Sequence, residues 1–404
     1  HRAAAKYAHG EAEELFTRAV TAARGLRGVT DEEKAKAYIA LADAQTAIGR
    51  NDAALLNLRR ARVRPKEAPL MKAGIYRRQA AILRDSSSIA AALRSVDRGL
   101  RQIEGLNSKE SWAITSQLLA VASSSYKYGA KHEKALELAV QALEAAEIAK
   151  DDLAIADAQM AIHSELIYLG RTDASHGFQA LGLYEKIGRR DRLAHALNNL
   201  AVSTWFDGDI PSAVEQFRTA HEMAKMAGDL HTESITLLNV GEGLLAVGDT
   251  VGAESVLREC IPPLRAAGMT GMEVAALRLL SDCLCQRSRP EEALQQLVVA
   301  LELAEKIGDI EERIQTLSAT AEVLVKQGKF AEAVVTCDRA FDLAGNHEAD
   351  LVIPRLLRIK GDALLAAGRE TEAIESLMRA RVVAERYDPN ELQRINETLN
   401  SLQT

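Results

Sequence analysis

The sequence has little of what several other fold classes require. Of its 404 residues only 4% are aromatic and only 8 are proline, a composition poor for β-sandwiches and suited to helices that pack through small contacts. There are 4 cysteines, too few to cross-link a chain of this length, and none forms a C-x-x-C pair, which argues against a disulfide framework and a thiolate zinc site. The composition therefore predicts an all-α protein in a reducing compartment.

Targeting and membrane signals are also missing. No run of eighteen apolar residues occurs, and charged residues are spread through the first thirty positions in place of an apolar signal core. We therefore expect a cytoplasmic protein that makes no membrane contact. Because the sequence begins with His1, we also expect it to be a piece of a longer chain.

No catalytic or cofactor motif is recognisable. The sequence contains neither a G-x-x-x-x-G-K-[ST] loop nor an H-E-x-x-H pair, and its one G-x-G, Gly241-Glu242-Gly243, lies inside a predicted helix. Cys283 and Cys285 are two residues apart, which on a helix points them to different faces, so we interpret them as core residues rather than joint metal ligands. The sequence predicts a chain with no catalytic residues, no metal and no cofactor.

Small residues recur along the whole chain with a step near forty residues. A glycine is followed five residues later by a small residue and seven further on by another, as in Gly208, Ala213 and Ala220. In three copies another small residue stands at the glycine position, and the forty-residue step is kept. These residues are Ser288, Ala130 and Ser87. The last small residue of each copy falls at positions 19, 61, 99, 142, 182, 220, 260, 300, 340 and 380, which indicates a repeat array of about ten copies.

Each copy predicts a pair of amphipathic helices joined by a tight turn at the glycine, for example 193–206 and 211–226. Small residues seven apart share one helix face, where a larger side chain would keep neighbouring helices apart. One pair cannot bury its own apolar face, so the pairs must stack into a continuous core. We predict one domain over 1–404, with a half-repeat cap at 1–28, about nine repeats at 29–388 and a capping helix at 389–404.

One segment should break this regularity. Pro262-Pro263 follows Cys260 inside a predicted second helix, and proline removes a helical hydrogen bond and clashes with the preceding turn. We expect the helix to kink or end there.

The repeat, seen in Leu200-Ala201 before Gly208 and then in Ala213 and Ala220, resembles the tetratricopeptide repeat in its forty-residue form. This resemblance implies a right-handed α-solenoid whose first helices line a concave side that receives a protein or peptide segment. The sequence departs from the best repeats at Ser87 and at His163, which takes a helix-contact position where a small residue is usual.

Three segments carry a second resemblance. Tyr7–Val20, Ala196–Val202 and Ile359–Ala373 are similar to the C-terminal repeat regions of large bacterial signalling proteins. Those proteins join a regulatory ATPase module to a class III adenylate or guanylate cyclase domain, or to a DNA-binding domain as in the maltose-regulator type. This resemblance implies a regulatory region of a longer bacterial protein.

Candidate binding residues follow from the repeat positions. Asn199 and Asn239 are equivalent in adjacent repeats, and each carboxamide offers a donor and an acceptor to a peptide backbone. Tyr128, Tyr168 and Phe206 occupy matching places in three consecutive repeats, as anchors for a partner or as inter-repeat core. The predicted concave face comprises His195, Asn198, Asn199, Val202, Trp205, Phe206, Asn239, Glu242, Tyr128, Tyr168, Arg278 and Asp282, and its mixed charge continues through Glu322, Arg355, Arg358 and Asp362. The alternative is a solvated face without a partner.

Charge is unevenly distributed. The chain has a formal net charge of -7, yet residues 57–101 hold twelve basic residues against three acidic ones. This segment predicts a basic docking patch for an acidic partner or an upstream domain, with a solvated face as the alternative. Nucleic acid is disfavoured, because the overall balance is acidic and no base-reading element is present. The predicted patch consists of Arg59, Arg60, Arg62, Arg64, Arg77 and Arg78.

These observations favour a non-enzymatic interaction module that binds a protein or peptide, other domains of the same polypeptide included, and regulates attached catalytic or DNA-binding domains. Two alternatives stay open. The chain could be a stand-alone peptide receptor or a self-association scaffold. The sequence preceding His1 would separate the first hypothesis from the other two, and light scattering at rising concentration would test self-association.

Overall fold

A computed structural model describes residues 2–26, 28–63, 67–85, 88–129, 131–171, 173–345, 352–387 and 389–402. Over these ranges the chain consists of α-helices joined by short connections, with no β-strand. The predicted all-α class is therefore confirmed. Within the same ranges no helix is long and apolar enough to cross a membrane.

The helices group into two compact units. Unit 1 comprises His1–Ser212 with Glu222–Asp229, and unit 2 comprises Ala213–His221 with Leu230–Thr404, so α11 (Ile210–Ala227) contributes to both. The remaining helices of unit 1 are α1 (Arg2–Gly25), α2 (Asp31–Ala47), α3 (Asn51–Arg62), α4 (Pro69–Asp85), α5 (Ile89–Gln102), α6 (Lys109–Tyr128), α7 (His132–Ala149), α8 (Asp152–Tyr168), α9 (Ser175–Lys186) and α10 (Arg190–Phe206). Those of unit 2 are α12 (Leu230–Ala246), α13 (Thr250–Ala267), α14 (Thr270–Gln286), α15 (Pro290–Ile307), α16 (Ile310–Lys326), α17 (Phe330–Ala344), α18 (Ile353–Ala366), α19 (Glu370–Tyr387) and α20 (Pro389–Ser401).

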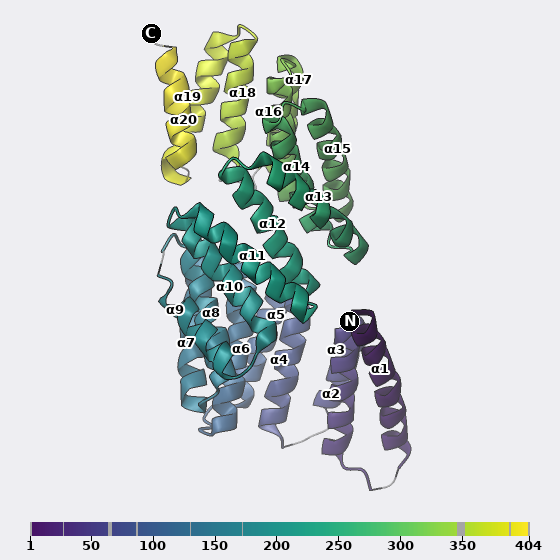
Figure 1. Ribbon diagram of the computed structural model, residues 1–404. Coiled ribbons are helices and arrows are strands. Elements are labelled where there is room, and N and C mark those ends of the chain that lie inside the picture. Colours follow the sequence, from purple (N-terminus) through teal and green to yellow (C-terminus); the bar gives the residue numbers. More distant parts are fainter. Residues whose placement is uncertain are drawn as a thin grey trace. The chain divides into compact units, whose positions relative to one another are not determined.

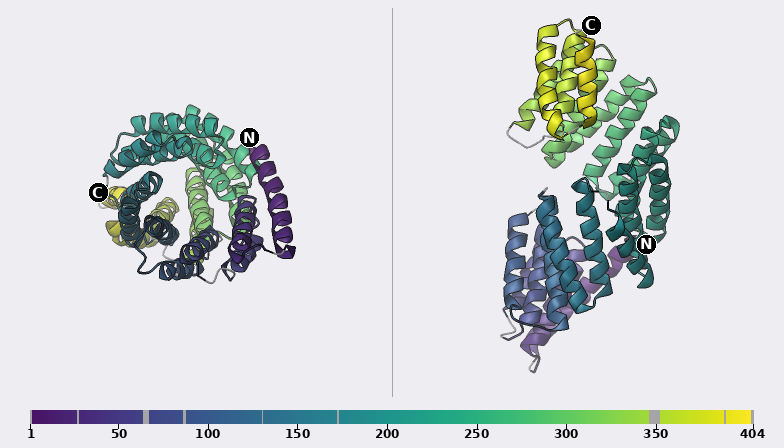
Figure 2. Two further views of the ribbon diagram at one scale, coloured as in Figure 1. Left: turned by 90° about the horizontal axis from the view of Figure 1, so that it is seen from below. Right: turned by 90° about the vertical axis from the view of Figure 1, so that its left-hand side faces the viewer.

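Consecutive helices form the predicted hairpins, each with an even-numbered first helix and an odd-numbered second helix, as Figure 1 shows for α4 and α5 and for α18 and α19. The pairs in contact are α2 with α3, α4 with α5, α6 with α7, α8 with α9, α12 with α13, α14 with α15, α16 with α17 and α18 with α19. First helices also pack on the first helices of the next hairpin, α4 on α6 and α6 on α8 in unit 1, and α14 on α16 and α16 on α18 in unit 2. Successive second helices make no comparably extensive contact in the described parts of the chain. Adjacent hairpins are therefore closer together at their first helices than at their second helices. Within each unit the stack curves accordingly, and the first helices line its inner side. The right-hand view of Figure 2 shows the yellow helices α18, α19 and α20 side by side.

Small residues allow this close packing. A side chain at Gly99 would place its Cβ 2.9 Å from Cδ2 of Leu118 on the neighbouring first helix, so only glycine fits there without a shift. The predicted contact positions are accordingly buried at Ala54, Ala61, Ala92, Gly99, Ala135, Ala142, Ala213, Ala220, Ala253, Cys260, Ala293, Ala300, Ala333, Ala340, Ala373 and Ala380. The interpretation of the repeat as a packing pattern is confirmed at these positions.

Where the structure describes the repeat glycine position of a hairpin turn, the residue there is left-handed. Gly208 has φ 89°, and Ser288 adopts φ 58° at the equivalent place. A residue with a Cβ is strained in this region, whereas glycine is not. Ser288 thus keeps the repeat in phase at a cost in stability.

Three of the predicted contact positions are wrong, two of them in α9. Ser175 and Gly182 are exposed, and Gly177 and Tyr184 are buried in their place. The connection between α8 and α9 is longer than in other hairpins, because α9 begins only at Ser175, and this moves the packed face of α9 by two residues. In α1 the predicted Ala19 is likewise exposed. The phase positions Ser87 and Ala130 lie outside the described residues.

His163 shows how the fold accepts a large residue at a helix contact. Its side chain is completely buried on α8, and the facing residue on α9 is Gly177. A Cβ on Gly177 would lie 2.9 Å from Cδ2 of His163 and 2.8 Å from Cδ2 of Leu200. The missing side chain of Gly177 therefore provides the space that the imidazole fills.

Of the two outcomes expected at Pro262-Pro263, a kink or an end of the helix, the end is wrong. Helix α13 continues through both prolines to Ala267. Cys260 and Leu264, which flank the prolines, are both buried in the core of unit 2. This packing holds the helix together across the hydrogen bonds that the prolines cannot make.

Candidate binding surfaces

The predicted binding stripe on α10 differs in exposure from residue to residue. His195 and Phe206 are exposed, Asn199, Val202 and Trp205 are half-buried, and Asn198 is buried. Asn199 donates a hydrogen bond from Nδ2 to Sδ of Met160 on α8 at 3.4 Å. Much of this stripe therefore belongs to the contact between first helices.

Three aromatic side chains stand exposed at the ends of successive first helices in unit 1. Tyr128 is the last residue of α6, Tyr168 of α8 and Phe206 of α10, and their exposed fractions are 71%, 61% and 63%. The interpretation of these residues as inter-repeat core is therefore wrong. They form an aromatic row along one edge of the inner side of unit 1.

Tyr168 is held in place by its neighbours. Its ring stacks on His132, with ring centroids 4.6 Å apart, and Nζ of Lys127 lies 5.0 Å from its centroid. Both neighbours are tied to buried Glu165, His132 through Nδ1 at 2.8 Å from Oε2 and Lys127 at 3.8 Å from Oε1. Desolvation lowers the pKa of Lys127, although the nearby Glu165 carboxylate opposes this effect. The exposed part of Tyr168 thus belongs to a ring that its neighbours hold in place.

The first helices of unit 2 carry the charged side chains that the sequence assigned to the concave face. Ion pairs join Arg355 to Glu322 at 2.5 Å and Arg358 to Asp362 at 2.8 Å and to Glu391 at 2.6 Å. Arg278 pairs more loosely, 3.4 Å from Glu312. These pairs link α14 to α16, α16 to α18 and α18 to α20, so most of the predicted charges hold neighbouring hairpins together.

Two predicted carboxylates differ from the rest. Within the described residues, Glu242 on α12 and Asp282 on α14 have no ion pair or hydrogen bond. Desolvation is the main cause that raises the pKa of each, and for both the positive Arg278 acts in the opposite direction. Neither carboxylate is therefore held in a close ion pair, although positive side chains act on both from a distance. Asn239, the other predicted residue of α12, is half-buried and already has an interaction partner.

The predicted basic docking patch is divided by the structure. Arg78 forms a 2.8 Å ion pair with Asp43, Arg77 is half-buried, and Arg60 donates to Asn57 at 3.2 Å. Desolvation and then the neighbouring Arg78 lower the pKa of Arg77. The sixth member, Arg64, lies outside the described residues.

Arg59 and Arg62 are instead brought together with Arg94 and Arg98 around one pocket. The sequence placed all four in the basic segment 57–101. The spacing of Arg94 and Arg98, four residues apart on one helix, was the available signal for a shared face.

The cysteines give no sign of a metal site. Cys260, Cys283 and Cys337 are buried, Cys285 is half-buried, and all four are free thiols. Across the part of the chain that the structure describes, no group of three or more His, Cys, Asp or Glu side chains is placed to hold a metal ion.

No protein-family model matches the sequence, and a search of the curated proteins finds no match. Solved structures do share the fold. A Rap protein complexed with competence and sporulation factor is 13% identical, with a TM-score of 0.64 over 88% of this chain and 98% of that one. Aspartyl phosphate phosphatase F from Bacillus subtilis is also 13% identical, with a TM-score of 0.59 over 91% and 96%.

A third similar structure is a signal transduction ATPase with numerous domains (STAND) that has a tetratricopeptide repeat sensor, from Pyrococcus horikoshii. It is 13% identical with a TM-score of 0.65, and the match covers 93% of this chain but 56% of that one. At this level of identity the likeness concerns the fold. Together with the forty-residue hairpins, it shows that this chain has the tetratricopeptide-type helical repeat fold.

Proposed function

We propose that this chain is a non-enzymatic regulatory module that binds a protein or peptide segment. The aromatic row of Tyr128, Tyr168 and Phe206 carries the proposal, because exposed aromatic side chains in a fixed arrangement supply much of the binding energy at protein interfaces. The ring of Tyr168, stacked on His132, loses little freedom when a partner covers it.

An extended peptide fits the spacing of this row. Packed helices lie roughly 8–10 Å apart, which equals about three residues of extended chain. A peptide with an apolar side chain at about every third position would therefore meet one aromatic ring per repeat. Oδ1 of Asn199, to which no described residue donates a hydrogen bond, could accept from the peptide backbone.

Peptides selected from a displayed random library on the purified chain test this proposal. We expect Tyr168→Ala combined with Phe206→Ala to weaken the best peptide at least tenfold in fluorescence anisotropy, as truncation of interface anchors does. Phe178→Ala is the matched control, because Phe178 is 61% exposed but lies on the second helix α9. Equal affinity of the two variants would remove the aromatic row from the binding site.

For the wider context we propose the sensor or interaction module of a bacterial cytoplasmic signalling protein with an ATPase and a cyclase or DNA-binding output. The STAND structure, of which this chain matches 56%, supports this reading. The alternative of a stand-alone peptide receptor is supported by the Rap structure, because 98% of that chain is matched. An ATPase domain encoded upstream in the same gene would favour the first proposal, and a gene limited to the repeats would favour the second.

The absence of enzymatic activity is part of the proposal and has its own test. Nucleotide hydrolysis or phosphate release by the purified chain, lost on mutation of its own residues, would contradict it.

A further inference from the structure

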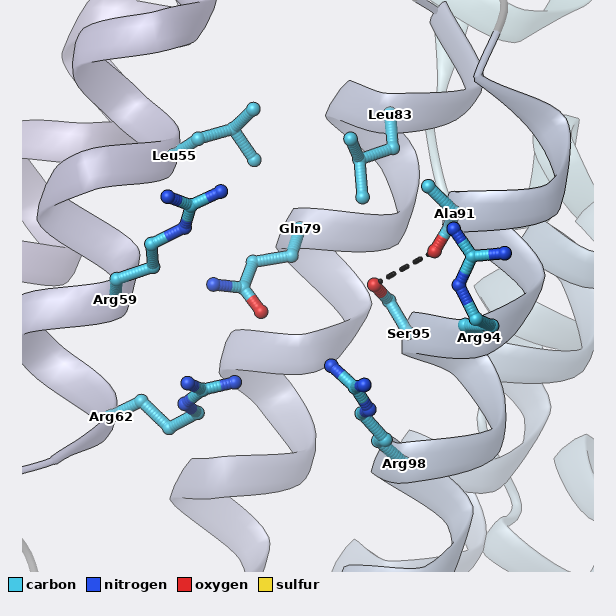
Figure 3. Close-up of a pocket in the computed structure, with 9 residues that line it drawn as sticks. All are labelled: Leu55, Arg59, Arg62, Gln79, Leu83, Ala91, Arg94, Ser95 and Arg98. Carbon is cyan, nitrogen blue, oxygen red and sulfur yellow. Dashed lines mark hydrogen bonds between the residues drawn. The ribbon is translucent and has the colours of Figure 1, made fainter.

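A pocket of about 440 Å³ opens between α3 and α5 in unit 1, with α4 as its floor (Figure 3). Arg59 and Arg62 of α3 and Arg98 of α5 point into the space between these helices, and Arg94 lies at its edge. The pocket therefore gathers four guanidinium groups from two successive second helices, on the side of unit 1 that the aromatic row does not occupy.

These arginines lack acidic partners. Within the described residues no carboxylate lies at ion-pair distance from Arg59, Arg94 or Arg98, and Arg62 donates only to the hydroxyl of Tyr76 at 3.1 Å. Nearby arginines that point elsewhere are paired, for example Arg101 with Asp97 at 2.6 Å. Four like charges repel one another, and an anion bound between them would offset this repulsion.

A glutamine that faces the pocket provides an independent sign of a ligand. Gln79 on the floor of the pocket is only 6% exposed, and no described residue forms a hydrogen bond with its carboxamide. Figure 3 shows this carboxamide pointing into the space beside Arg59 and Arg62. Because this carboxamide faces the pocket and has no partner among the described residues, it offers a donor and an acceptor to a ligand beside the guanidinium groups.

We propose that this pocket binds a small ligand with two or more phosphoryl groups, such as a diphosphate or triphosphate ester. Guanidinium groups bind phosphate oxygens in a bidentate manner, and a di- or triphosphate concentrates several negative charges in a pocket of this size. An acidic peptide spreads its charges along an extended chain, whereas this pocket is confined to three consecutive helices. Leu55 and Leu83 at the upper end in Figure 3 offer an apolar surface to the organic part of an ester.

Isothermal titration calorimetry on the full chain tests the proposal with pyrophosphate, tripolyphosphate and ATP, at about 50 mM salt, where screening is weak. We expect saturable binding of one ligand per chain. Arg59→Gln combined with Arg98→Gln should weaken binding at least tenfold, and Gln79→Leu should weaken it severalfold without a change in charge. Tighter binding of ATP than of tripolyphosphate would identify an ester, and equal binding would identify the phosphate chain alone as the ligand.

The matched control is Arg60→Gln combined with Arg101→Gln. These two arginines lie on the same helices and carry the same charge but do not line the pocket, so binding should stay within twofold. Equal losses in both double variants would mean unspecific attraction and would overturn the proposal. It would also be overturned if none of the three phosphates binds, or if a hexaglutamate peptide binds more tightly than tripolyphosphate. Because none of these residues belongs to the aromatic row, either outcome leaves the peptide-binding proposal to its own test.

Discussion

At the scale of single residues, the contact between His163 and Gly177 shows what the repeat pattern requires. One of the two facing residues must be small, but it need not be the one on the usual helix. Small residues predominate at these helix contacts, but at α8 and α9 the large and the small partner have changed places. His163 is also hydrogen-bonded, with Ser203 Oγ 3.2 Å from its Nε2. Burial lowers the pKa of His163 and so favours the neutral form of its imidazole.

Gly177→Ala should therefore destabilise unit 1. The added methyl group would clash with the ring of His163 and with Leu200, which costs about 1–3 kcal/mol and outweighs the gain of up to about 1 kcal/mol in helix propensity. Denaturant unfolding followed by circular dichroism measures the difference. Gly182→Ala on the same helix is the control, because no atom lies within 4 Å of its new Cβ and only the propensity gain remains. A Gly177→Ala midpoint equal to or above that of Gly182→Ala would contradict this account.

At the scale of helices, the charges on the inner side of unit 2 separate pairs that join neighbouring hairpins from carboxylates that lack a partner. Asp282 belongs to the second group. Desolvation raises its pKa in the folded chain, and Arg355 opposes this shift. An acid with a higher pKa in the folded than in the unfolded state binds its proton more tightly when folded, so its ionisation lowers stability as the pH rises.

Asp282→Asn should consequently raise the free energy of unfolding at neutral pH by an amount on the order of 1 kcal/mol. The difference from the natural chain should shrink as the pH falls and vanish below the unfolded pKa of about 3.9, where both chains are neutral at this position. Thermal unfolding across pH 3 to 8 measures it. Glu302→Gln removes one negative charge from an exposed position on α15 and serves as the control. A pH-independent effect of Asp282→Asn would contradict the assignment to ionisation.

The helices also show what sequence can and cannot predict. Small residues at a forty-residue step reveal which faces pack, because glycine and alanine are the side chains that permit close approach, as at Gly99. The shift of the packed face of α9 could not be predicted from the sequence. Ser175 and Gly182 are small and fit the forty-residue step, although they are exposed. The pocket between α3 and α5 depends on how two hairpins pack, which the sequence of neither hairpin specifies. Likewise, the sequence identifies Tyr128 as aromatic, but only the packed helices show that it is exposed.

At the scale of the whole molecule, stability should be the sum of local interfaces. In a stacked array each hairpin contacts only its neighbours, so a destabilising substitution lowers mainly the stability of the hairpins next to it. The described helices agree with this, because their most extensive contacts join consecutive helices and first helices of adjacent hairpins. The division into two compact units is consistent with this, because most contacts of a helix lie within its own unit.

Hydrogen exchange on the full chain tests this locality. Gly177→Ala should speed exchange of the backbone amides in α8, α9 and α10, whose interfaces contain the added methyl group, and leave those in α14 to α18 within twofold of the natural chain. Gly182→Ala, measured in parallel, should leave both regions unchanged or slightly more protected. A uniform acceleration in both units under Gly177→Ala would mean that the chain opens as a single cooperative body. In that case its stability could not be divided among hairpin interfaces, and a partner bound to the inner side of unit 1 would protect unit 2 as strongly as the helices that it touches.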